Sequence, residues 1–160
     1  MGITGHLDLT AATGVSVTCG IRHHLNGLSS HSLIGFTCLA RGADTLFAQQ
    51  MIAVGGRLVV IIPASDYFDR VSSEEAPLYR SLVDHAWAIR RMPALHAGDE
   101  AYAAANTVLL NSIDQLIAVW DGDPEGGVGG TAAVVREARR RHLPVSVIWP
   151  EGACRVRLEG

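Results

Sequence analysis

Short apolar runs alternate along the chain with longer segments in which apolar residues recur at helical spacing. Runs such as RLVVIIP and DQLIAVW are apolar without alternation, which is typical of strands buried on both faces. The pattern predicts strands at 1–4, 32–36, 57–63, 88–92, 114–120 and 144–149. It predicts helices within 10–26 and at 43–54, 74–87, 98–112 and 131–142.

The order of these elements predicts the fold class. Strands that alternate with helices, and that are apolar on both faces, form a parallel sheet covered on both sides. Right-handed crossovers then make a three-layer, doubly wound α/β fold. At 160 residues the chain fits one domain, which we assign to 1–150, with a C-terminal tail at 151–160. Ser72 and Glu75 have the spacing of a capping box before the third helix.

Three loops that leave strand carboxyl ends carry unusual residues: 4–8, 37–44 and 121–131. In doubly wound sheets, ligands bind beyond the carboxyl ends of the strands, where the strand order reverses. We therefore expect the three loops to meet at one ligand site. The alternative is that they are ordinary connections whose residues only support the fold.

The third loop, DGDPEGGVGGT, contains Gly127, Gly129 and Gly130 before Thr131 opens a helix. Glycines let backbone N–H groups approach a ligand closely, and a helix start offers unpaired N–H donors and a positive dipole end. The loop therefore predicts a phosphate at the N-terminus of helix 131–142. A connection whose glycines only tolerate turns is the alternative. Asp121, at the end of the preceding strand, is a candidate for contact with a ribose or base.

The second loop offers Arg41 as a bidentate phosphate ligand, followed by Gly42 and by Asp44 near a helix start. In the first loop, Gly5 permits close approach and His6 can meet a ligand. No catalytic residue follows from the sequence, and the weak candidates are Asp121, His6 and Arg41. Each of these also fits a purely structural role in a cap or turn.

Composition and charge narrow the function classes. A net charge of −3 predicts that nucleic acid is not a partner, since nucleic-acid binders are usually basic. No apolar run reaches membrane-spanning length, and the three cysteines are far apart, so we expect a cytoplasmic protein without a membrane partner. The histidines and cysteines lack metal-ligand spacing, so no metal is expected. All thirteen basic residues are arginine, and without lysine no pyridoxal-phosphate Schiff base can form. No cofactor is required.

The segments ITGH, CLARGADTLFA and DQLIAVWDGDPEGGVGGTA resemble the SLOG superfamily. These are Rossmann-like nucleotide-binding domains that include the LOG phosphoribohydrolases, often labelled lysine decarboxylase-like, and the DprA-like domain. The resemblance spans roughly residues 2–149 and implies a nucleotide pocket. It places the following residues in that pocket: Gly5, His6, Arg41, Gly42, Gly127, Gly129, Gly130 and Thr131.

The chain departs from the phosphoribohydrolase pattern at one position. That branch resembles PGGxGTxxE, whose glutamate serves N-glycosidic cleavage, but Val134 stands three residues after Thr131. Glu137 lies six residues after Thr131, on roughly the opposite side of the helix. The sequence therefore favours binding of a nucleotide or nucleotide-derived ligand, for sensing or processing. An N-glycosidase acting on nucleoside 5′-monophosphates is one alternative, with Asp121, His6 or Asp44 replacing the glutamate.

A protein-interaction module without a ligand is the second alternative, with the 64–73 segment exposed to a partner. The resemblance also implies a homodimer formed through helices beside the site. Helix 98–112 is the candidate, because its small residues allow close approach. An alanine-rich face can equally pack flat against the sheet.

Overall fold

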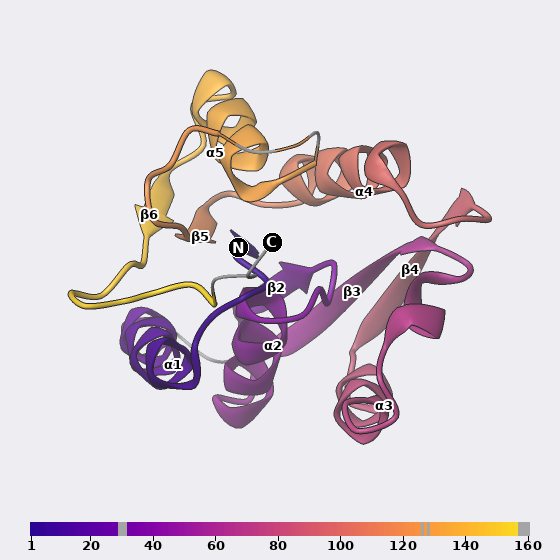
Figure 1. Ribbon diagram of the computed structural model, residues 1–160, viewed down its shortest axis with the longest axis horizontal. Coiled ribbons are helices and arrows are strands. Elements are labelled where there is room, and N and C mark those ends of the chain that lie inside the picture. The colour runs from indigo at the N-terminus through magenta and orange to yellow at the C-terminus, as the bar shows by residue number, and fades with distance from the viewer. Residues whose placement is uncertain (29–31, 126, 128, 157–160) are drawn as a thin grey trace.

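The computed structural model describes residues 1–28, 32–125, 127 and 129–156. Six parallel strands form one sheet in the order β4-β3-β2-β1-β5-β6 (Figure 1). The strands are β1 Gly2–Gly5, β2 Ile34–Thr37, β3 Arg57–Ala64, β4 Ala88–Ala94, β5 Leu116–Val119 and β6 Val145–Val147. The predicted parallel α/β fold is confirmed.

Helices cover both faces of the sheet. They are α1 Ala11–Asn26, α2 Ala43–Ala53, α3 Ala76–Asp84, α4 Asp99–Asn111 and α5 Thr131–Arg140, with a short 3-10 helix, η2, at Tyr67–Arg70. Figure 1 shows α1, α2 and α3 on one side of the sheet and α4 and α5 on the other. The η2 helix lies inside the 64–73 segment, for which the sequence pattern predicts neither a helix nor a strand.

The two largest apolar clusters of the described residues hold these layers together. The larger cluster joins α1, α2 and α3 to the sheet through fully buried side chains such as Ile21 and Phe47. The smaller cluster lies under α4 and α5 and includes Leu109 and Val134. Both clusters draw on β3, where Val60 faces the first and Ile61 the second. This burial on both faces explains the unbroken apolar run that predicted the strand.

The chain reverses its strand order at β1. From β1 it proceeds outward through β2, β3 and β4, and then crosses back to add β5 and β6 on the other side. The last residues of β1 and β5, Gly5 and Val119, are register partners. This is the topological switch point, where ligands bind in doubly wound sheets.

The residues after β6 fold back onto the beginning of α1. Arg155 and Leu9 form an isolated antiparallel bridge, and the Val156 N–H donates to the Asp8 carbonyl at 2.6 Å. The Thr13 hydroxyl donates to the Cys154 carbonyl at 2.9 Å. The described part of the predicted tail is thus bonded to the domain.

The capping box predicted before α3 and the dimer face predicted on α4 can each be compared with the structure. The Glu75 N–H donates to the Ser72 hydroxyl at 3.2 Å, as in a capping box, but this hydroxyl in turn donates to the Glu75 carboxylate at 3.0 Å and α3 begins only at Ala76. On α4, Ala101 and Ala105 are buried inside the chain, whereas Ala104 is exposed. The homodimer through this helix stays a prediction.

Within the described ranges, no helix is long and apolar enough to cross a membrane.

Candidate functional site

A cavity of about 370 Å³ lies beyond the carboxyl ends of β1, β2 and β3. Six of the predicted site residues line it, and α4 closes it on the opposite side. Its lining includes Gly5, Leu39, Arg41, Asp44, Tyr67, Arg70, Glu75, Tyr79, Tyr102, Asn106, Gly129, Gly130 and Thr131. Chain segments far apart in the sequence therefore meet here, as the switch-point argument predicts.

The start of α5 forms one wall of the cavity. Gly130 is the N-cap residue, with extended backbone (φ −73°, ψ 168°), and no side chain of the described residues caps the helix. Gly129 has φ +81°, a conformation that favours glycine, and its carbonyl accepts a hydrogen bond from Asn106 Nδ2 at 3.0 Å. The helix start is thus held in place by α4, and its first N–H groups have no side-chain acceptor.

Asp44 fixes the loop between β2 and α2. Its Oδ2 accepts hydrogen bonds from the Thr37 hydroxyl at 2.8 Å and from the Cys38 N–H at 3.1 Å. The Leu39 N–H donates to the Thr37 hydroxyl, and Leu39 adopts φ +57°, which strains a non-glycine residue. Burial raises the pKa of Asp44 to about 6, against the opposing effect of these hydrogen bonds. This carboxyl therefore supports the cavity wall and also borders the cavity.

The raised pKa of Asp44 predicts a pH-dependent stability. The folded chain binds this proton more tightly than the unfolded chain, so deprotonation between pH 4 and pH 6 lowers the free energy of unfolding. Two pKa units correspond to about 3 kcal/mol at most. The wild type should lose stability relative to Asp44→Asn over this range, as chemical denaturation at pH 4 and pH 7 would measure. A stability difference that stays constant across the range would contradict the assignment.

Two arginines border the cavity. Arg41 is exposed, and among the described residues it has no hydrogen-bond or ion-pair partner. Arg70, on η2, donates from Nη2 to the Ala97 carbonyl at 3.4 Å. Glu75 is the acidic side chain that borders the cavity besides Asp44, and it contacts Ser72. The guanidinium of Arg41 is therefore available to an anionic ligand.

Tyrosines supply the aromatic part of the wall. The Tyr67 and Tyr102 ring centroids are 6.1 Å apart in an edge-to-face arrangement, and Phe68 lies between Tyr67 and Tyr79 with centroid distances of 5.4 and 6.0 Å. Burial raises the pKa of Tyr79 to about 12 and raises that of Tyr67 further, so both phenols stay protonated. Sequence reasoning missed these residues, although the position of 64–73 after the carboxyl end of β3 indicates the same edge.

Gly5 and Gly42 serve packing. A Cβ added at Gly5 would lie 2.4 Å from the Ala43 Cβ and 2.7 Å from the Val119 Cβ. Gly42 has φ +79°, and an added Cβ would lie 2.5 Å from the His6 carbonyl oxygen. Both glycines let α2 approach the end of β1 closely, which brings Arg41 and Asp44 to the cavity. Gly127 has no atom within 4 Å of an added Cβ and does not border the cavity.

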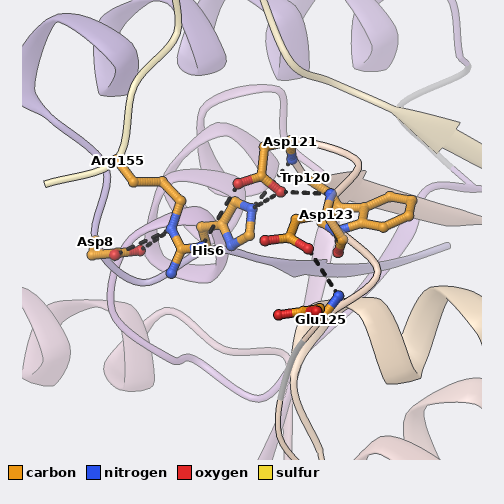
Figure 2. Close-up of polar contacts among 7 residues, drawn as sticks. All are labelled: His6, Asp8, Trp120, Asp121, Asp123, Glu125 and Arg155. Atoms are coloured by element: carbon orange, nitrogen blue, oxygen red, sulfur yellow. Dashed lines mark hydrogen bonds and ion pairs between the residues drawn. The ribbon is translucent and has the colours of Figure 1, made fainter. Parts of the chain in front are cut away.

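His6 and Asp121 lie together but outside the cavity (Figure 2). His6 Nε2 is 3.0 Å from Asp121 Oδ1, and the His6 ring meets the Trp149 ring edge-to-face at 5.4 Å. The other oxygen of Asp121 is 3.7 Å from Arg155 Nη1. The structure thus brings the two residues to the switch point as predicted, but directs their side chains away from the ligand wall.

Neither Val134 nor Glu137, the one acidic residue of α5, borders the cavity. Val134, at the position of the glutamate of the phosphoribohydrolases, is buried in the cluster beneath α4 and α5. Glu137 contacts Arg140 and Arg141, and the hydrogen bonds from their guanidiniums lower its pKa to about 2. A carboxylate held ionised in this way is unsuited to general acid catalysis.

Comparisons with known proteins give matches in structure alone. No protein-family model matches the chain, and no curated protein matches it in sequence. DNA processing protein A (DprA) from Streptococcus pneumoniae is 14% identical, with a TM-score of 0.67 over 94% of this chain and 50% of that one. DprA from Helicobacter pylori is 12% identical, with a TM-score of 0.67 over 94% of this chain and 65% of that one.

A third similar structure is the Moco carrier protein of Chlamydomonas rheinhardtii. It is 18% identical, with a TM-score of 0.53 over 91% of this chain and 72% of that one. The chain therefore spans most of this carrier, but only half to two thirds of the two DNA-processing proteins.

The prediction from net charge that nucleic acid is not a partner is wrong. The net charge argued against a nucleic-acid partner, yet the chain shares its fold with a DprA whose structure is described as showing single-stranded DNA binding. Net charge sums over the whole chain, whereas a nucleic acid contacts one surface, so a mild acidic excess does not exclude a local basic patch. At identities of 12–18%, these similarities show the fold alone: the chain has the Rossmann-like α/β fold of all three proteins.

Proposed function

We propose that the cavity binds a nucleotide or a nucleotide-derived phosphate ligand. The observation that carries this proposal is the N-terminus of α5, which borders the same cavity as the Arg41 guanidinium; within the described part of the chain, neither has a side-chain partner. Backbone N–H groups and the positive end of the helix dipole favour an anion at this place. Arg41 adds a planar donor that matches phosphate geometry. The three motifs and the shared fold support a divergent member of the SLOG superfamily.

The remainder of the cavity suits a nucleoside. With the phosphate at Thr131, the tyrosines of η2, α3 and α4 offer ring faces and edges to a base. Asp44 and Glu75 offer acceptors for the donor groups of a base or ribose. A volume of about 370 Å³ lies at the small end of the range for ligand pockets and suits a mononucleotide.

Isothermal titration calorimetry against nucleoside mono- and diphosphates, ADP-ribose and NAD tests the proposal. We expect at least one of these ligands to bind, and Arg41→Ala to weaken that ligand about tenfold through loss of a charge-assisted contact. Arg22→Ala is the matched control, because Arg22 is exposed and donates to Gln50 on the α1–α2 surface. Failure of every ligand at millimolar concentration would contradict the proposal.

The same samples test turnover. His6 and Asp121 lie outside the cavity, so an N-glycosidase would have to use Asp44 or Glu75, the acidic residues that border it. Chromatography of AMP incubated with the protein would detect free adenine. Release of adenine that Asp44→Asn abolishes would favour the enzyme over a binding protein.

A second candidate function is binding of single-stranded nucleic acid at the sheet edge formed by β4. The observation that favours it is an aromatic and basic edge: Trp87 is 60% exposed, the Arg57 guanidinium lies 4.9 Å from its ring centroid, and the exposed Arg90 and Arg91 project from the two faces of this edge strand. Arginine guanidiniums bind phosphates and exposed aromatic rings stack on bases. The two similar DNA-processing proteins add support from the fold.

Fluorescence anisotropy with a labelled oligothymidine tests this second function. We expect salt-dependent binding that Trp87→Ala with Arg90→Ala weakens about tenfold. Arg139→Ala is the control, because Arg139 also lies over a tryptophan, Trp120, but belongs to α5. If Arg139→Ala weakens oligothymidine binding as much as the Trp87→Ala, Arg90→Ala variant does, β4 is not the contact surface.

A further inference from the structure

A polar cluster lies at the switch point, outside the cavity, and joins three distant parts of the chain. We call His6, Asp8, Asp121 and Arg155 the switch-point cluster (Figure 2). Asp121 lies at its centre: Oδ1 is 3.0 Å from His6 Nε2, and Oδ2 is 3.7 Å from Arg155 Nη1. Arg155 Nε donates to both oxygens of Asp8, at 3.0 and 3.2 Å. One guanidinium therefore holds two carboxylates that follow β1 and β5.

The backbone fixes Arg155 in this position. Leu9 and Arg155 form an antiparallel bridge, and hydrogen bonds on both sides of it continue the pairing. The Thr10 N–H donates to the Cys154 carbonyl at 3.3 Å, and the Val156 N–H donates to the Asp8 carbonyl at 2.6 Å. The Arg155 side chain thus reaches Asp121 from an anchored segment, which lowers the entropy that the contact costs.

Asp121 also fixes the beginning of the loop that leads to α5. Its Oδ1 accepts the Asp123 N–H at 3.0 Å, and Asp123 Oδ1 in turn accepts the Glu125 N–H at 2.9 Å. Trp120 Nε1 donates to the Asp123 carbonyl at 2.9 Å. Figure 2 shows this series of contacts running from His6 and Arg155 to Glu125. The loop reaches Gly129, at the cavity wall, only four residues later.

We propose that His6 and Arg155 are positioning residues for the ligand site: they orient Asp121, which holds the 121–125 turn and so places the start of α5 at the cavity. The inference rests on the proposed function, because it assigns a role in binding at that site. It explains why polar side chains concentrate at the switch point yet face away from the cavity.

Hydrogen exchange of the free protein tests the positioning without any ligand. Arg155→Ala should accelerate exchange at the Asp123, Glu125 and Val134 amides about threefold or more, because the loop and the first turn of α5 open more often. The Val134 N–H bonds to the Gly130 carbonyl at 3.1 Å and reports on that turn. Arg22→Ala should leave these amides unchanged. Unchanged exchange in Arg155→Ala would overturn the inference.

Calorimetry with AMP tests the consequence for binding. We expect Arg155→Ala to weaken AMP about fivefold and Arg155→Lys to restore only part of the affinity, since lysine keeps the cation but not the fork that contacts both carboxylates. If the wild type binds AMP and Arg155→Ala binds it equally, the positioning role is wrong although the proposed function holds. If the wild type binds no nucleotide, the proposed function fails, and the exchange rates alone decide whether Arg155 positions the loop.

Discussion

Gly130→Asp should abolish nucleotide binding while leaving the fold at least as stable. Gly130 has the extended backbone of a typical N-cap residue, and no side chain of the described residues caps α5. An aspartate there can accept the free N–H groups of the first turn and complement the helix dipole, so the melting temperature should stay the same or rise slightly. The new carboxylate occupies the position proposed for the phosphate. Two anions in contact repel by several kcal/mol, so affinity should fall about 100-fold or more.

Gly130→Asn separates charge from size in this experiment. Asparagine caps a helix about as well as aspartate and has nearly the same shape, but it carries no charge. Calorimetry with the tightest-binding nucleotide of the panel should therefore show a modest loss of affinity in Gly130→Asn and a complete loss of binding in Gly130→Asp. If Gly130→Asp binds as tightly as the wild type, the phosphate does not lie at the N-terminus of α5.

Most of the fold follows from the sequence, because a strand that is buried on both faces of the sheet appears in the sequence as an unbroken apolar run. The run at 57–63 is apolar throughout, and the strand Arg57–Ala64 indeed packs helices on both sides. The η2 helix did not follow, because one turn of 3-10 helix has too few residues to show a periodicity. Because the sequence does not predict η2, it also does not predict that Tyr67 and Arg70 of this helix form part of the cavity wall.

The candidate site followed from the sequence in part. Parallel strands end at one edge, so the loops with Arg41, Asp44 and Thr131 were expected to meet, and the cavity lies among them. That argument does not say which way a side chain points once its strand has ended. His6 and Asp121 come to the same edge but turn toward Arg155, which is far from both in the sequence. Such a long-range ion pair leaves no local signal in either segment.

Gly5→Ala should destabilise the fold strongly. The added Cβ would lie 2.4 Å from the Ala43 Cβ, 2.7 Å from the Val119 Cβ and 2.9 Å from the Val119 carbonyl oxygen, so α2 and β5 would both have to move. Overpacking against such neighbours costs about 3 kcal/mol, which corresponds to a melting temperature about 6–12 °C lower. Gly98→Ala is the matched control, because nothing lies within 4 Å of its added Cβ and its φ is −179°. Ala43→Gly in the Gly5→Ala background should recover part of the loss, since it removes the closest contact. Thermal unfolding of the four proteins measures these effects, and a Gly5→Ala variant as stable as Gly98→Ala would show that α2 does not pack against β1 at this distance.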